Sequence, residues 1–170
     1  MKAIDLTYRI SSIDGLHLCD ASFKIRMYRQ QDGKIDGLIY IVLSSTVPNS
    51  AERKSKDEIS FGWSGEENSA RSWIDMVISE HLRNRGIGTF IWHVVYEHLP
   101  ENLKNSFIVS GKLSPQDQPE PRNSFWKKLL CFDSDPQFTF NLKESGWGYF
   151  QGRLCSTNLQ RFPKIEVLMI

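Results

Sequence analysis

The segment Arg83–Gly88, with the sequence RNRGIG, constrains this chain most because it stands between an apolar run and a long apolar helical pattern. Residues 73–78 are predicted to form a strand, and residues 87–99 a helix that Pro100 ends. Glycines let backbone N–H groups approach a ligand closely, and the first N–H groups of a helix have no partner inside it. The sequence therefore predicts an anion-binding loop suited to a pyrophosphate.

The rest of the chain reads mainly as strands, with one further short helix at residues 122–131. Strands are predicted at residues 2–10, 23–30, 35–45, 58–64, 107–113, 138–143, 147–155 and 165–170. Polar loops are predicted at residues 44–58, 65–70 and 114–121. This pattern indicates an α+β arrangement in a single domain covering residues 1–170.

Composition narrows the class of protein. Hydrophobic residues make up 40% of the 170 positions, and the formal net charge is only +1, so no bulk charge favours nucleic acid or an anionic membrane. No apolar run approaches the length of a membrane span, and the N-terminus lacks a signal-peptide core. The three dispersed cysteines, Cys19, Cys131 and Cys155, argue against a disulfide framework or a zinc site. We expect a cytoplasmic protein.

Other phosphate-binding loops fit this segment less well. A dinucleotide-binding loop would place its third glycine at Ile91, and no repeated strand–helix–strand pattern follows. A nucleoside-triphosphate loop would end in Gly-Lys-Ser/Thr, which is absent here. The plain alternative is a helix N-terminus with a turn glycine and no ligand.

Two stretches resemble the GNAT superfamily of acyl-CoA-dependent N-acyltransferases. Residues 74–89, IDMVISEHLRNRGIGT, are similar to that family's cofactor motif, a strand that ends in R/Q-x-x-G-x-G/A before a helix. Residues 123–132, NSFWKKLLCF, are similar to its late F-Y-x-x-x-G-F helix, and one predicted strand lies between the two. The resemblance covers roughly residues 70–135. The family's long helical insert after the first strand is missing.

The resemblance implies a fold, a cosubstrate and a site. The fold would be a GNAT-like α+β fold, a central, mostly antiparallel twisted sheet with a V-shaped split between strands 73–78 and 107–113, flanked by helices. Acetyl-CoA would enter the split, and a primary amine, on a small molecule or a protein, would attack its thioester. The implied cofactor-binding residues are Val77, Ile78, Ser79, Arg83, Asn84, Arg85, Gly86, Ile87, Gly88 and Thr89.

The implied chemistry needs an oxyanion donor, a base and a proton for the leaving thiolate. A backbone N–H of Val77 or Ile78 would stabilise the oxyanion. Asp75 is the candidate base, against the alternative of a solvated or ion-paired strand carboxylate, and Glu66 or Glu67 could act through water.

The sequence departs from the family at the acid. The family's usual tyrosine is here Trp126, whose indole N–H cannot serve as an acid at neutral pH, and the usual earlier asparagine is replaced by the region 118–120. Cys131 stands where a glycine precedes the closing phenylalanine. Either the thiolate leaves unaided or with water, or another residue assists, or the protein is a non-catalytic module that binds CoA or a partner.

Several charged residues have more than one interpretation. Arg122, Lys127 and Lys128 form a basic patch that could reach the 3′-phosphate of CoA, an acidic acceptor or a charged tRNA, or could simply be a solvated helix face. Near-neutral net charge disfavours nucleic acid as a partner. His93 and Glu97 share a helix face, but no third ligand accompanies them, so no metal site is predicted. The resemblance also implies that two copies could pair as a homodimer through their C-terminal strands.

Overall fold

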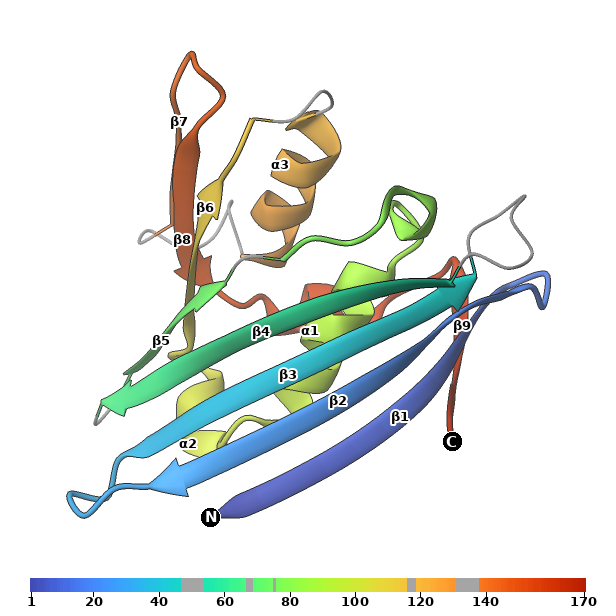
Figure 1. Ribbon diagram of the computed structural model, residues 1–170. Coiled ribbons are helices and arrows are strands. Elements are labelled where there is room, and N and C mark those ends of the chain that lie inside the picture. The colour runs from blue at the N-terminus through green and yellow to red at the C-terminus, as the bar shows by residue number, and fades with distance from the viewer. Residues whose placement is uncertain (47–53, 67–68, 75, 116–118, 131–137) are drawn as a thin grey trace.

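Nine strands form one sheet in the computed structural model, which describes residues 1–46, 54–66, 69–74, 76–115, 119–130 and 138–170 (Figure 1). The strand order is β7-β8-β6-β5-β4-β3-β2-β1-β9, and every described pair is antiparallel except β5 with β6. The strands are β1 (Lys2–Ser12), β2 (His17–Arg29), β3 (Ile35–Thr46), β4 (Lys54–Glu66), β5 (Ser69–Ile74), β6 (Ile108–Leu113), β7 (Thr139–Leu142), β8 (Gly148–Arg153) and β9 (Ile165–Met169). The α-helices are α1 (Ile87–His98), α2 (Glu101–Lys104) and α3 (Pro119–Leu129), and the 3₁₀ helices are η1 (Glu80–Leu82) and η2 (Ser156–Gln160).

The four long strands β1–β4 follow from a period-two pattern of side chains. In β2, Phe23, Ile25 and Met27 are buried, and the residues between them are partly or fully exposed. Gly15 and Gly33 have φ of 82° and 86°, left-handed values that the short turns after β1 and β2 require. Two tight hairpins therefore keep β1, β2 and β3 adjacent, and β4 pairs with β3 beyond them.

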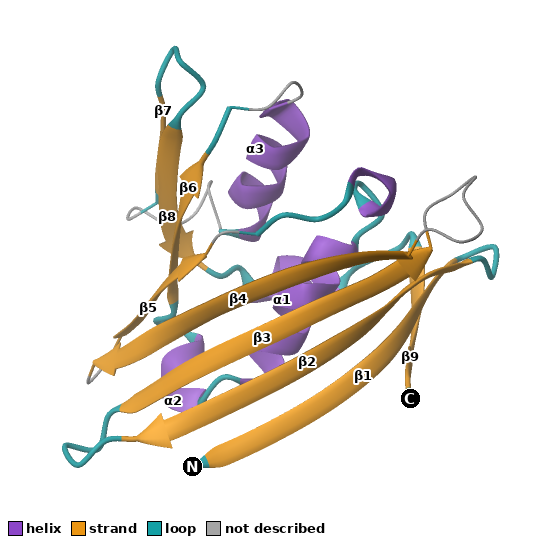
Figure 2. Ribbon diagram, viewed as in Figure 1, coloured by secondary structure: helices purple, strands orange, loops and turns teal. Residues whose placement is uncertain are grey.

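Helix α1 covers the apolar face of β1–β4. Figure 2 shows α1 and α2 behind these strands and α3 beside β6. The ring of Phe90 lies edge-on to Tyr8 and Phe23, with centroids 5.1 and 6.3 Å apart, and Trp92 lies 5.2 Å from Phe61. On its other side α1 meets α3, where Trp92 and Trp126 are 6.2 Å apart. Packing on two sides explains why α1 is apolar around most of its circumference.

The expected GNAT-like α+β fold with a helix-flanked sheet is wrong. The described chain is rich in β-structure, with nine strands in one sheet and three α-helices of 12, 4 and 11 residues. The connection between β1 and β2 spans only residues 13–16, so no helix is available there to cover the outer face of β1–β4. The mostly antiparallel pairing of the expected sheet is confirmed.

The V-shaped split that went with this fold also needs correction. Residues 71–74 of β5 pair in parallel with residues 108–111 of β6, so the two segments are joined over that stretch. β5 ends at Ile74 rather than Ile78, and beyond it the chain runs away from β6 toward η1 (Figure 1). Residues 76–79 have no regular secondary structure.

The predicted loop at residues 44–58 is partly strand, because β3 continues to Thr46 and β4 begins at Lys54. In residues 54–58 the alternation is between exposed charges and partly buried Ser55 and Asp57, so an apolar pattern does not reveal it. Among the helices that the structure describes, none combines the length and the apolar character that crossing a bilayer requires.

Candidate functional site

The loop before α1 contains two residues in left-handed backbone conformations. The 3₁₀ helix η1 leads into Arg83, and Asn84 and Gly86 then adopt left-handed conformations, with φ of 59° and 92°. Asn and Gly are the residues that most readily take such values, because Gly has no Cβ and Asn can bond locally. Helix α1 begins directly after Gly86, so this turn presents the N-terminus of α1.

The backbone N–H groups of this turn have no partner among the described residues. The first bond into α1 is from the N–H of Phe90 to the carbonyl of Gly86, 3.0 Å. No acceptor among the described residues takes the N–H groups of residues 84–89, no side chain caps the helix, and its first turn has no acidic residue. Gly86, Gly88 and Thr89 are only partly buried. These donors are therefore available to water or to a ligand as far as the described residues are concerned.

Three cationic side chains lie against the same turn. The Nε of Arg83 donates to the carbonyl of Ile78 at 2.6 Å, and the Nε of Arg85 donates to the carbonyl of His81 at 3.0 Å. The Nζ of Lys164, far along the chain, donates to the carbonyl of Asn84 at 3.1 Å. None of the three forms an ion pair within the described part of the chain, so their charges add to the positive end of α1.

Side chains at the end of β3 and the start of β4 form hydrogen bonds to residues 79 and 81, which lead into this turn. Asp57 accepts two hydrogen bonds from Ser79, one from its N–H at 2.8 Å and one from its Oγ at 2.6 Å. The Oγ of Ser45, which is 6% exposed, lies 2.8 Å from Nε2 of His81, and Ser55 Oγ lies 3.1 Å from Ser79 Oγ. We call these contacts of Ser45, Ser55 and Asp57 with Ser79 and His81 the brace of the turn, and the sequence did not predict them. The only signal was that inward positions of an alternating segment become polar at residues 45, 55 and 57.

Gly86 and Gly88, the two glycines of the motif, are required for different structural reasons. A Cβ on Gly88 would lie 3.0 Å from Cε2 of Phe125 and 3.2 Å from Cε of Met76, so Gly88 allows α1 to pack against α3 and the end of the 76–79 segment. A Cβ on Gly86 would come no nearer than 3.4 Å, to Phe162, and its need for glycine is the positive φ. Close packing of the protein itself therefore accounts for Gly88, whereas Gly86 shapes the open turn.

The structure brings most of the predicted cofactor-binding residues to this turn. Arg83, Asn84, Arg85, Gly86, Gly88 and Thr89 all lie in it. Ser79 is tied to Asp57, Ile87 is buried in the core, and Val77 is an apolar side chain left 60% exposed. The N–H groups of Val77 and Ile78 have no described acceptor.

Of the predicted catalytic residues, the structure describes only Trp126. Asp75, Glu67 and Cys131 lie outside the described residues, and the side chain of Glu66 is not described either. Trp126 is 6% exposed and stacks on Phe150, with centroids 4.2 Å apart and planes at 23°, so it belongs to the hydrophobic core.

The other charged or titratable residues considered in the sequence lie away from this turn or on the surface. His93 faces the ring of Phe162 at 5.6 Å, Lys127 lies 5.2 Å from the centre of Phe140, and Lys128 is exposed. The described residues contain no group of three or more His, Cys, Asp or Glu side chains that could hold a metal ion. Two surface hollows, of about 550 and 530 Å³, are lined by residues other than 83–89.

Comparisons of the chain with protein-family models, with curated proteins and with solved structures found no match.

Proposed function

We propose that this protein is an N-acyltransferase that moves an acetyl group from acetyl-CoA to a primary amine. The observation that supports it is the row of N–H groups at residues 84–89 without an acceptor among the described residues, beside Arg83, Arg85 and Lys164. A pyrophosphate is dianionic and rich in acceptor oxygens, so it suits both the donors and the positive helix end. The dispersed cysteines, with Cys19 buried, support the cytoplasm as the proposed compartment.

The residues before the turn supply the remaining steps of the proposal. The N–H groups of Val77 and Ile78 lack described acceptors, so one could hold the pantetheine arm and the other could stabilise the tetrahedral oxyanion. Bound acetyl-CoA would supply the acyl group as an activated thioester. Because Trp126 is enclosed in the core, we assign no acid to it, and water is the proposed proton source for the thiolate. The proton from the amine would pass to Asp75 or to water.

The alternative is a non-catalytic module that binds CoA or a partner. The specific observation in its favour is the same burial of Trp126, because the position of the usual acid then offers no proton donor. In either case a second copy of the chain, paired along the C-terminal strands, is the proposed protein partner.

Calorimetric titration tests the shared part of both proposals. CoA should bind, and pantetheine, which lacks the pyrophosphate, should bind at least roughly tenfold more weakly because the backbone donors then have no anion. Lys164→Gln should weaken CoA binding several-fold, and Lys24→Gln, on the exposed face of β2, should leave it unchanged. Absence of CoA binding at millimolar concentration would reject the proposal.

A pair of glycine variants separates ligand contact from backbone strain. Gly86→Ala and Gly15→Ala place the same side chain at φ of 92° and 82°, so both should lose about 1 kcal/mol of stability. Only Gly86→Ala should also lose CoA affinity, because only Gly86 is in the turn. Equal CoA affinity in the two variants would contradict the site.

An assay for thiol release distinguishes the enzyme from the module. Wild-type protein with acetyl-CoA and a panel of primary amines should produce CoA steadily with at least one amine. Normal CoA binding without thiol release for any amine would favour the module.

A further inference from the structure

A second hollow, of about 530 Å³, lies between the start of α3 and the β7–β8 turn. Its volume is in the range that holds small ligands. Pro115, Pro119 and Leu142 give it apolar walls, and Arg122, Lys143 and Glu144 are its charged residues. In Figure 1 the two elements stand at the same end of the molecule, on either side of the end of β6. The hollow is thus small, mixed in polarity and net cationic.

Arg122 is fixed in this hollow by neutral acceptors. Its Nε and Nη2 donate to Oδ1 of the buried Asn123 at 3.0 and 2.8 Å, and its Nη1 donates to the carbonyl of Ser114. A guanidinium has five N–H donors, so two remain after these three bonds. The side chain is therefore held in place with donors still available.

Among the residues that the structure describes, none provides a counter-ion for Arg122. No carboxylate of the described residues pairs with it, although the side chain is partly buried, and burial lowers the pKa of its guanidinium. Partly desolvated charges in proteins are normally paired, because an unpaired one loses hydration without compensation. A fixed arginine that lines a hollow, and that no described carboxylate pairs with, therefore points to an anion from outside the chain.

We propose that this hollow binds the carboxylate of a small organic acid, with Arg122 as the residue that recognises it. A planar guanidinium with two remaining donors matches the two oxygens of a carboxylate. Lys143 adds a second cation, the N-terminus of α3 adds a partial positive charge, and Glu144 favours a ligand that also has a cationic or neutral end.

The hollow is close to the turn of α1 along α3. Phe125, which approaches Gly88, follows Arg122 by three residues, about 4.5 Å along the helix axis. In the proposed acyl transfer the carboxylate would belong to the amine acceptor. That assignment rests on the proposed function, whereas carboxylate binding in the hollow does not.

Titration with glutarate and glutaramide, two probes of equal length with and without carboxylates, tests the site in the absence of CoA. The amide NMR signals of Gly146 and Trp147, next to the hollow, should shift with glutarate at about millimolar concentration and not with glutaramide. Arg122→Lys should weaken the response because an ammonium lacks the planar pair of donors. Arg122→Gln should abolish it, and Lys128→Gln, an exposed cation of the same helix, should leave it intact.

Three results would overturn the proposal. One is an equal response to glutarate and glutaramide in the wild type, which remains informative if Arg122→Gln does not fold. Another is an unchanged glutarate response in folded Arg122→Lys and Arg122→Gln. The third is that Arg122→Gln weakens binding of CoA but not of 3′-dephospho-CoA, since Arg122 would then serve the nucleotide phosphate. Glutarate binding without any CoA binding would support this site and count against the proposed acyl transfer.

Discussion

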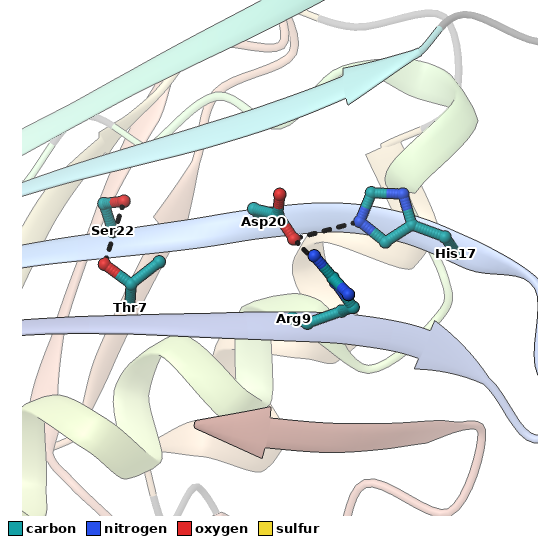
Figure 3. Close-up of polar contacts among 5 residues, drawn as sticks. All are labelled: Thr7, Arg9, His17, Asp20 and Ser22. Atoms are coloured by element: carbon teal, nitrogen blue, oxygen red, sulfur yellow. Dashed lines mark hydrogen bonds and ion pairs between the residues drawn. The ribbon is translucent and has the colours of Figure 1, made fainter. Parts of the chain in front are cut away.

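The two faces of β1–β4 place the same strands in opposite environments. On the inner face, Phe23, Ile25 and Ile41 are almost fully buried under α1. On the outer face the contacts are polar. Figure 3 shows Thr7 with Ser22 and Arg9 with Asp20, which join β1 to β2, and His17 with Asp20 within β2. Their separations are 3.5, 3.6 and 3.0 Å in that order. The comparison teaches that the position of a residue in the alternation, more than its type, decides what it contributes.

Two aspartates show this most directly. Asp20 lies on the outer face, with its side chain 36% exposed, and bonds to side chains that are themselves solvated. Asp57 lies at an inward position of β4 and accepts both the N–H and the Oγ of Ser79 at 2.8 and 2.6 Å. Asp20 therefore makes only exposed contacts on the surface of the sheet, whereas Asp57 holds the segment that leads to the turn before α1.

The largest expected difference between the faces is in packing. Phe23→Ala should lower the free energy of unfolding by about 3–5 kcal/mol, because the ring leaves a cavity against Tyr8 and Phe90. Lys24→Ala, one residue along on the outer face, should change it by less than about 0.5 kcal/mol. Urea denaturation of both variants measures this. Similar losses for the two would show that α1 does not cover the inner face.

The second prediction contrasts the two aspartates. Asp57→Ala should lower the free energy of unfolding by about 1–3 kcal/mol, because Ser79 loses a partly buried acceptor. Asp20→Ala should lower it by at most about 1 kcal/mol, as exposed ion pairs contribute little. Thermal or urea denaturation gives both values, and hydrogen exchange should show faster exchange in residues 79–82 for Asp57→Ala alone. Equal exchange in the two variants would contradict the bracing role.

The inner face was predictable from the sequence where its pattern is apolar. Residues 23–30 and 35–45 alternate or run apolar, and they lie in β2 and β3. The N-terminus of α1 was also predictable, because glycines and arginines precede an apolar helix. The alternation cannot show which face a helix covers, so the missing cover on the outer face, and with it the β-rich character of the fold, was not foreseen.

The brace of the turn could not be predicted from the sequence, for a different reason. Ser45, Ser55 and Asp57 have the composition of a surface loop, and their roles depend on Ser79 and His81, which lie 22 to 36 positions away along the chain. A pairing between distant polar residues leaves no periodic signal in a single sequence. Arg122 is a similar case. Only the structure shows that its partners among the described residues are the neutral groups of Ser114 and Asn123 rather than a carboxylate.

The third prediction uses the thiol of Cys19 as a probe of the inner face. Burial, with smaller contributions from Asp20 and Asp57, raises the pKa of Cys19 from 9.0 to about 12. The unfolded chain therefore ionises this thiol first, so its stabilising contribution is complete below pH 9.0 and is lost as the pH rises toward 12. The loss should be about 1.4 kcal/mol per pH unit in that window.

Cys19→Ala should flatten the pH dependence of stability by this amount, apart from any constant loss due to the smaller side chain. Urea denaturation at pH 9.0 and one unit higher measures the slope in wild type and variant, and the other cysteines cancel in the difference. Parallel slopes for the two proteins would mean that Cys19 ionises in the folded state and that this part of the inner face is open to water.

The smallest expected effect is on the outer face, at the pair of Asp5 with Arg26. Nη1 of Arg26 donates to Oδ1 of Asp5 at 2.6 Å, and this bond lowers the pKa of Asp5 below its usual 3.8. The contribution of Asp5 to stability is therefore present above pH 3.8 and is lost as the pH falls through the lower folded value. Because the carboxylate is solvated, salt should weaken the pair.

An NMR titration of the Asp5 carboxyl should give a midpoint below 3.8 in the wild type and near 3.8 in Arg26→Gln. Arg9→Gln is the control, because Arg9 pairs with Asp20 instead. A midpoint that Arg26→Gln leaves in place would show that strand position, rather than the paired charge, sets the titration on this face.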